Sequence, residues 1–160
     1  MLFRSHIAIQ VAIHWGCEVF VFTRSEAHRA LARQLGARWT GAAEDDPPAG
    51  LDAAVIFAPA GRLVPEALRA LAKGGTVVLA AITMSPITQL DYALLYQERT
   101  VRSVANSTRQ DVLDLLKLAA EIPIRAEVQT FALEEANHAL QLLKQSRFRG
   151  AGVLTIPYLP

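Results

Sequence analysis

Cysteine is nearly absent from this sequence, and its absence excludes whole classes of site. Among the 160 residues there is one cysteine, Cys17. A single thiol rules out an internal disulfide framework and any metal site built from several cysteines. We expect Cys17, which lies just before an apolar run, to be a small buried residue. The scarcity also favours a cytoplasmic location, because disulfides occur mainly in oxidising compartments.

The sequence also has little net charge and no long apolar run. Lysine and arginine number 16 against 15 acidic residues, which gives a formal net charge of +1 without any long basic run. We therefore expect no nucleic acid partner, because such domains concentrate positive charge on one face. No apolar segment reaches the roughly 18 residues of a membrane span, so we expect no membrane partner. The hydrophobic fraction of 52% suits one folded domain over residues 1–160.

What the sequence does contain is a regular alternation of helix and strand patterns. Helical spacing of apolar residues predicts helices over residues 5–15, 25–35, 64–73, 112–119 and 136–143. Short apolar and β-branched runs predict strands over residues 19–22, 37–40, 51–57, 76–82, 101–105, 128–131 and 153–156. The alternation predicts a Rossmann-like, doubly wound α/β fold with a mostly parallel sheet. Ligands of such folds bind beyond the carboxyl ends of the strands.

Several side chains have predicted positions at the ends and faces of these helices. Ile7, Val11 and Trp15 are spaced by four and predict the buried face of the first helix. Thr108 followed by Asp111 resembles a capping box. These residues therefore predict where the first helix packs and where the 112–119 helix begins.

We expect structural roles for the histidine and tryptophan side chains. The four histidines, His6, His14, His28 and His138, all fall in predicted helices. We expect surface or packing roles for them, because a metal site needs several converging ligands. Trp15 and Trp39 are expected in the core or at its margin.

Glycine is absent from the part of the chain where a dinucleotide-binding domain needs it most. In that fold the first strand leads into G-x-G-x-x-G and a helix, whose N-terminus receives the pyrophosphate. No glycine precedes Gly16, and the sequence opens directly inside the helix. We therefore expect a fold lacking the first strand and the glycine-rich loop. Without the first strand, the strands over residues 19–22 and 51–57 would have unpaired backbone groups. The two strands could pair directly, residues 1–5 could extend between them, or another chain could pair with them. We expect self-association, because exposed strands are templates for pairing.

An acidic residue is also missing from the end of the strand over residues 19–22. A carboxylate at that position binds the adenosine ribose hydroxyls and indicates NAD. The sequence has Thr23, Arg24 and Ser25 instead, two hydroxyls and a guanidinium that suit the 2′-phosphate of NADP. The alternative interpretation is that Ser25 caps the next helix beside a solvated Arg24.

Four segments resemble one family, the medium-chain, zinc-type alcohol dehydrogenases. They are residues 6–12 (HIAIQVA), 71–79 (LAKGGTVVL), 98–109 (ERTVRSVANSTR) and 131–136 (FALEEA). The resemblance covers residues 5–156 and implies the nucleotide-binding part of a dehydrogenase that uses NADP or NAD. It also implies that a catalytic domain with the zinc ligands lies outside this chain. We therefore expect neither zinc nor a catalytic residue here.

The resemblance further implies how the cofactor meets this chain. Ala58 and Pro59 would border a ribose, while Ala81, Ile82 and Asn106 would approach the nicotinamide end. It also implies an edge-strand dimer contact within residues 85–90, which again favours a homo-oligomer.

Three points stay open at this stage. An arginine that family members often have near the last strand is missing, and Arg147 or Arg149 is a possible substitute. A non-catalytic dinucleotide-sensing or interaction module fits the same pattern. A zinc-free quinone reductase-like domain is a further alternative, against which the segment 103–106 (SVAN) counts by resemblance.

Overall fold

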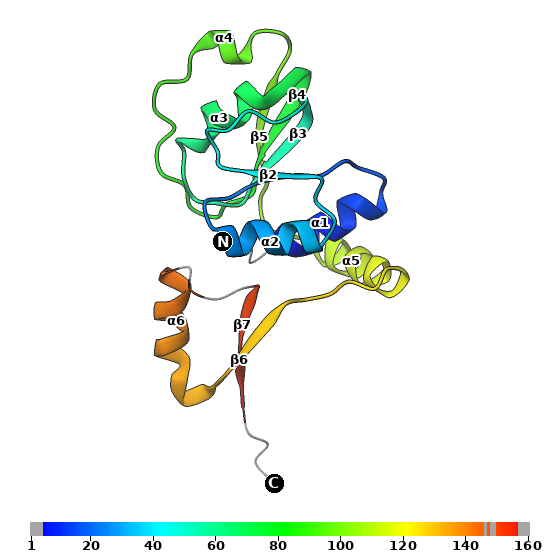
Figure 1. Ribbon diagram of the computed structural model, residues 1–160, viewed down its shortest axis with the longest axis vertical. Coiled ribbons are helices and arrows are strands. Elements are labelled where there is room, and N and C mark those ends of the chain that lie inside the picture. Colours follow the sequence, from blue (N-terminus) through cyan, green and yellow to red (C-terminus); the bar gives the residue numbers. More distant parts are fainter. Residues whose placement is uncertain (1–4, 146, 148–149, 157–160) are drawn as a thin grey trace. The chain divides into compact units, whose positions relative to one another are not determined.

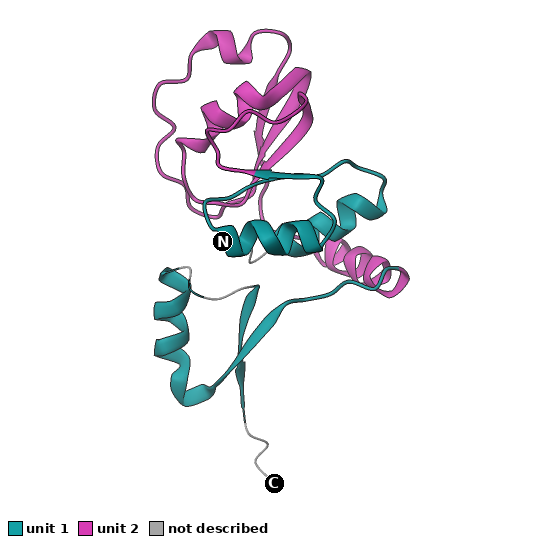
Figure 2. Cartoon of the chain, viewed as in Figure 1, with its two compact units in different colours: residues 1–40, 122–160 teal, residues 41–121 magenta. Residues whose placement is uncertain are grey.

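The computed structural model describes residues 5–145, 147 and 150–156. They form two compact units (Figure 2). The first unit comprises residues 1–40 and 122–160, and the second comprises residues 41–121. Within the described residues, no helix is both long and apolar enough to cross a membrane.

The helices and strands follow the predicted alternation closely (Figure 1). The first unit contains α1 (Ser5–His14), β1 (Phe20–Phe22), α2 (Glu26–Gln34), β2 (Trp39–Gly41, ending at the first residue of the second unit), β6 (Val128–Ala132), a 3₁₀ turn (Leu133–Glu135), α6 (Ala136–Lys144) and β7 (Ala151–Thr155). The second unit contains β3 (Leu51–Ile56), α3 (Leu63–Ala70), β4 (Leu71–Leu79), α4 (Tyr92–Leu95), β5 (Thr100–Ser103) and α5 (Arg109–Glu121).

Strands β3 to β5 and strands β6 and β7 pair in parallel, as the alternation predicts. In the second unit β3 pairs with β4 and β4 with β5, both in parallel. In the first unit β6 and β7 form a parallel pair. The Rossmann-like α/β class is therefore confirmed. The described strands form three separate sheets, in the orders β1-β2, β3-β4-β5 and β6-β7, so β3 lies at the edge of its sheet.

The second unit has the better packed core. Val64 and Leu68 of α3 and Val77 of β4 are fully buried, because the i, i+4 spacing on α3 turns both of its residues toward the sheet. The predicted helix end at residue 73 is wrong. Leu71 already has extended backbone angles, begins β4 and pairs with Leu51.

The first unit is organised by the packing of α1 on α2. Ile9 of α1 and Leu31 of α2 are buried in one cluster, against which Ile13 also packs. The predicted buried face of α1 is therefore wrong, and Trp15 is 68% exposed. The apolar residues of α1 lie on more than one face of the helix, so a spacing of four does not identify the buried one. Trp39 is half-buried as expected, with its ring 5.0 Å from that of Phe22.

The two predicted helix caps have different outcomes. The Thr108–Asp111 capping box is confirmed, since the Thr108 N–H donates to Asp111 Oδ2 at 2.7 Å and the Asp111 N–H donates to Thr108 Oγ1 at 3.2 Å. The Thr108 hydroxyl also donates to Asp111 Oδ2, at 2.8 Å. The bonds from the Thr108 N–H and hydroxyl favour the charged form of the carboxylate and hold the pKa of Asp111 below its ordinary value. Ser25 does stand at the start of α2, but its side chain makes no capping hydrogen bond.

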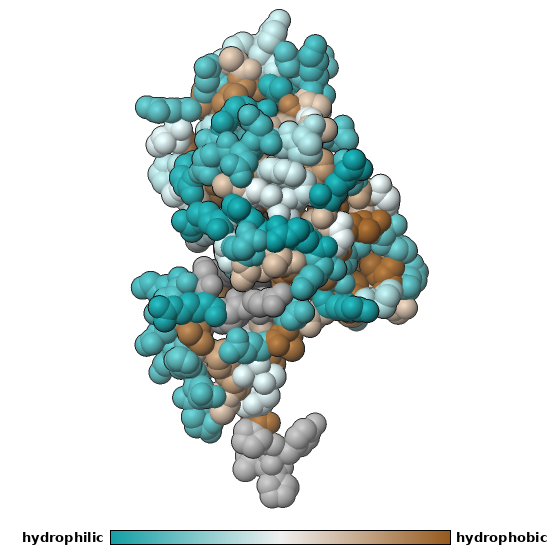
Figure 3. Space-filling model, viewed as in Figure 1, coloured by the Kyte–Doolittle hydropathy of each residue, from teal (hydrophilic) through white to brown (hydrophobic). Residues whose placement is uncertain are grey.

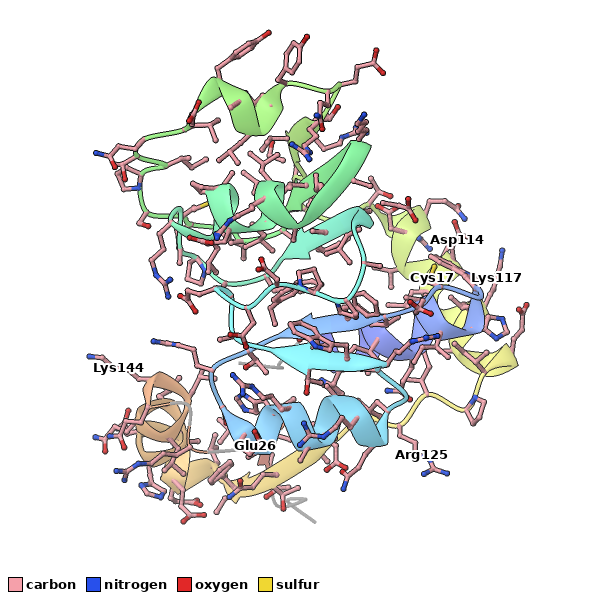
Figure 4. The ribbon with its side chains drawn as sticks, turned by 45° about the horizontal axis from the view of Figure 1, so that its top comes forward. Cys17, Glu26, Asp114, Lys117, Arg125 and Lys144 are labelled. Atoms are coloured by element: carbon pink, nitrogen blue, oxygen red, sulfur yellow. The ribbon has the colours of Figure 1, made fainter. Side chains whose placement is uncertain are left out.

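The chain leaves α5 for β6 through a segment that is fixed to α1. The Gln10 side chain donates to the Arg125 carbonyl at 2.9 Å and accepts from the Arg125 N–H at 2.8 Å. Arg125 is labelled in Figure 4. An amide side chain thereby satisfies both backbone groups of one residue, as a neighbouring strand would. This polar pair holds the start of the C-terminal segment.

Candidate functional site

In the second unit, the carboxyl ends of three strands lie in register. Ile56 of β3 pairs with Leu79 of β4, and Leu79 pairs with Ser103 of β5. Because the three strands are parallel, the loops that follow them leave the sheet at the same edge (Figure 1). Ligands of parallel α/β sheets bind at this edge.

Five of the predicted cofactor residues follow these three strand ends. Ala58 and Pro59 come after β3, Ala81 and Ile82 after β4, and Asn106 after β5. The Ile82 side chain is 84% exposed, and Asn106 is exposed as well. Such exposure leaves both side chains open to a ligand.

Two of these loops are also bonded to each other, which the sequence analysis did not anticipate. The Gly61 N–H donates to Ser85 Oγ at 2.9 Å, and the Ser85 N–H donates to the Pro59 carbonyl at 3.3 Å. Helical and strand periodicity contain no signal for a contact between two loops.

The other three predicted cofactor residues lie in the first unit, between β1 and α2. Arg24 is exposed and Thr23 and Ser25 are half-buried. The Thr23 carbonyl accepts a hydrogen bond from Arg29 Nε at 2.8 Å, which holds the turn against α2. The Arg24 guanidinium makes no hydrogen bond or ion pair with any residue that the structure describes. Its donors are therefore available to an anion.

The nearest carboxylate does not replace the missing acidic residue. Glu26, labelled in Figure 4, lies in the first turn of α2 rather than at the end of β1. Its carboxylate pairs with Arg33 and lies 3.9 Å from Arg29 Nη1. Two cations therefore offset the Glu26 charge, and the positive charge of Arg24 is left for a ligand. The residues after β1 therefore offer hydrogen-bond donors and a positive charge, and no carboxylate.

The donor set for a metal ion is missing from the described residues. No group of three or more histidine, cysteine or acidic side chains in that part of the chain has the geometry to hold an ion. The expectation that Cys17 is buried is wrong, because its thiol is exposed just after α1. His6 and His28 are 2% exposed, as packing residues are. The residues described here therefore do not fit a zinc ion.

Two hollows, one in each unit, are lined by none of the predicted cofactor residues. In the second unit a cavity of about 590 Å³ lies where β4 and β5 begin; it is lined by Lys73, Tyr92, Leu95, Tyr96, Gln97 and Glu98. In the first unit a hollow of about 260 Å³ is lined by Gln10, Ile13, His14, Leu35, Ile122, Pro123 and Ile124. None of the eight predicted residues lines either hollow. Arg149, one possible substitute for the family's arginine, and residues 1–4 of the leader lie outside the described residues.

Parallel strand pairing, with helices between the strands and open loops at their carboxyl ends, defines a Rossmann-like α/β protein of the nucleotide-binding type. A family model described as "Zinc-binding dehydrogenase" matches residues 5–121, most of the chain. The chain belongs to the zinc-binding dehydrogenase family and corresponds to its nucleotide-binding part.

Known proteins similar to this chain agree with that assignment. A probable alcohol dehydrogenase, AdhA, of Mycobacterium tuberculosis is 43% identical over 95% of this chain. The structure of an alcohol dehydrogenase from Aeropyrum pernix superposes with a TM-score of 0.84 at 22% identity over 94% of this chain. An acetophenone reductase from Geotrichum candidum, solved with NAD, gives 0.82 at 22% identity over 93%. The chain spans 44%, 46% and 44% of these three proteins, respectively.

Proposed function

We propose that this chain binds a nicotinamide dinucleotide, with NADP preferred over NAD, as the nucleotide-binding part of a zinc-type alcohol or aldehyde oxidoreductase. The observation that supports NADP is the Arg24 guanidinium just after β1, which is exposed and has no partner among the described residues. No carboxylate stands at that position, and Glu26 is paired with arginines of its own helix.

The adenosine end of NADP suits Thr23, Arg24 and Ser25 by charge and by hydrogen bonding. A 2′-phosphate carries close to two negative charges and three acceptor oxygens. A guanidinium donates to such an anion in a bidentate way, and the two neighbouring hydroxyls supply further donors. The acetophenone reductase was solved with NAD, so the preference for NADP is argued from these three residues alone.

The nicotinamide end suits the small side chains after β3 and β4. Ala58 and Pro59 are exposed and have no polar side chain that needs a partner. They therefore offer a flat apolar border to a ribose, while Asn106 offers an amide beyond β5. When bound, the nicotinamide supplies hydride exchange with a carbonyl carbon. This chain's contribution is to bind and orient the dinucleotide.

Calorimetric titration of the 160-residue chain with NADP and with NAD tests this proposal. We expect tighter binding of NADP, and Arg24→Ala should weaken NADP roughly tenfold or more while leaving NAD almost unchanged, because charge-assisted bonds to an anion contribute about 1.5–3 kcal/mol. Arg38→Ala is the matched control, since it removes an exposed arginine just before β2 that pairs with Glu18. Tighter binding of NAD, or an Arg24→Ala variant that binds NADP normally, contradicts the proposal.

Turnover of an alcohol needs groups that the described residues do not bring together. We propose that this chain alone oxidises no alcohol and retains no stoichiometric zinc. The support is the lack of a converging ligand set among those residues. Metal analysis of the purified chain that finds one tightly bound zinc per molecule overturns this point.

We further propose that the chain self-associates with a second copy of itself. Among the described strands β3 has a ladder partner on one side only, and a free strand edge is a template for pairing. Ile87 and Leu90, within the segment where the family resemblance implies a dimer contact, are 41% and 37% exposed. Light scattering over a concentration series should detect dimers, whereas a folded monomer at every concentration refutes association.

A further inference from the structure

The loops after β3 (residues 57–62) and after β4 (residues 80–91) touch backbone to backbone at Gly61. A Cβ atom at Gly61 would lie 2.4 Å from the Pro86 carbonyl oxygen and 2.5 Å from that of Ser85. Both distances are shorter than real Cβ atoms show, and both contacts are to backbone atoms that have little freedom to yield. Gly61 does not have a positive φ. Glycine is therefore needed here because of space and not because of its backbone angles.

Ser85 closes this contact with bonds in both directions. Its hydroxyl accepts from the Gly61 N–H at 2.9 Å, and its own N–H donates to the Pro59 carbonyl at 3.3 Å. On the other loop, the Ala60 N–H donates to the Ala58 carbonyl at 2.8 Å, which forms a tight turn. The conformation of the loop after β3 is thus tied at two points to one residue of the loop after β4.

The Gly61 N–H has its acceptor in the neighbouring loop. Gly61 precedes α3, which starts at Leu63, and the residue between them, Arg62, offers no side-chain cap. Gly61 is buried, and its N–H donates to the hydroxyl of Ser85. Because loss of an acceptor disfavours the conformation that buries an amide, Ser85 and Gly61 together favour the closed contact.

We propose that Ser85 is a positioning residue for the dinucleotide, a role that rests on the proposed function. Ala58 and Pro59, on the ribose side, belong to one of the two loops, and Ala81 and Ile82, on the nicotinamide side, belong to the other. With the loops joined, the ligand meets one preformed surface. Preformed surfaces bind more tightly because less conformational entropy is lost on binding.

A set of hydroxyl variants in the 160-residue chain tests this role. Ser85→Ala removes the acceptor, and Ser85→Thr keeps a hydroxyl in place. Thr100→Val is the matched control, because it removes an exposed hydroxyl at the amino end of β5, in the same unit, that makes no hydrogen bond with the described residues. The measurements are the Kd for NADP and for NAD by calorimetry, amide hydrogen exchange over residues 58–62, and the melting temperature.

We expect Ser85→Ala to accelerate exchange of the Gly61 amide and to weaken binding of both dinucleotides about three- to tenfold, which corresponds to the loss of one hydrogen bond. Ser85→Thr should restore binding, and Thr100→Val should match the wild type.

The possible results separate this inference from the proposed function. If the wild type binds a dinucleotide and Ser85→Ala binds it equally well, the positioning role is overturned and the proposed function stands. If Ser85→Ala lowers the melting temperature without weakening binding, the serine is merely structural and the inference fails. If the wild type binds neither dinucleotide, the proposed function fails and the positioning role fails with it.

Discussion

The β3–β5 sheet with α3, in the second unit, and the β6–β7 ladder with α6, in the first, differ sharply in how their apolar side chains are used. Val64, Leu68 and Val77 of the three-stranded region are fully buried. In the C-terminal ladder and its helix, Leu140 is 61% exposed and Val128 is 52% exposed. Figure 3 shows hydrophobic side chains on the surface over β6 and β7.

This difference in burial indicates that the two regions are stabilised by different interactions. Burial of apolar area stabilises the three-stranded region. In the C-terminal ladder only Phe131 is buried among the large apolar residues of the described β6, α6 and β7. Backbone pairing between β6 and β7 and the Gln10–Arg125 hydrogen bonds supply much of what holds that segment.

The largest expected effect contrasts two leucines on helices. Leu68→Ala in α3 should lower the free energy of unfolding by about 2–5 kcal/mol, because it leaves a cavity in a packed core. Leu140→Ala in α6 makes the same change at an exposed position, where we expect an effect within about 0.5 kcal/mol. Urea denaturation of both variants checks this. Equal losses would show that α6 is packed as tightly as α3.

Two glycines, one in each region, allow the backbone packing of the two regions to be compared by alanine substitution. Gly74 and Gly150 both have positive φ, +74° and +67°. Gly74→Ala should cost about 1–2 kcal/mol for the backbone angle alone, because nothing lies within 4 Å of the added Cβ. Gly150→Ala should cost about 1–3 kcal/mol more, since the added Cβ would lie 2.0 Å from the Glu127 carbonyl oxygen.

Exchange of amide hydrogens in β6 and β7 should therefore rise in Gly150→Ala and stay normal in Gly74→Ala. Normal exchange in both variants would argue that the ladder does not depend on this close backbone contact.

The smallest change in stability is expected from loss of the cap at the start of α5. This helix has no buried residue and depends on local interactions. Asp114 and Lys117, labelled in Figure 4, form an exposed ion pair with a 3.8 Å separation, and Thr108 with Asp111 forms the cap. The pKa of Asp111 is lowered in the folded chain. The cap therefore stabilises the helix above the unfolded pKa, and its contribution is lost as pH falls through the folded value.

An NMR titration should find the Asp111 pKa below 3.8, and Thr108→Val should raise it toward that value by removing the hydroxyl bond. A pKa that is unchanged in Thr108→Val would show that the backbone bond alone stabilises the carboxylate.

The alternation of periods was sufficient to predict the order of the helices and strands except α4, whose four residues are too short to show a helical period. In α3 the apolar residues occupy one face, and that face is buried. In α1 apolar residues lie on more than one face, and Ile9 rather than the predicted Val11 is buried. Nor does the apolar spacing of α5 reveal that Leu115 and Leu116 stay exposed. Periodicity predicts a helix and its apolar face, but burial also requires a partner surface.

The candidate site could be predicted only in part. The rule that ligands bind beyond parallel strand ends, together with the family resemblance, was enough to name residues such as Arg24 and Ala58. The bond between Ser85 and Gly61 depends on how two loops meet in space, which no local spacing encodes.

Hydrogen exchange with and without saturating NADP tests the central claim most directly. We expect protection at the carboxyl ends of the second unit's strands, over residues 58–62 and 80–85, and after β1 over residues 23–25. The amino ends of β4 and β5, including Lys73 and Glu98 beside the 590 Å³ cavity, should exchange as they do in the free chain. Protection confined to the residues that line that cavity, with none at the carboxyl ends, would contradict binding of the dinucleotide at the strand ends.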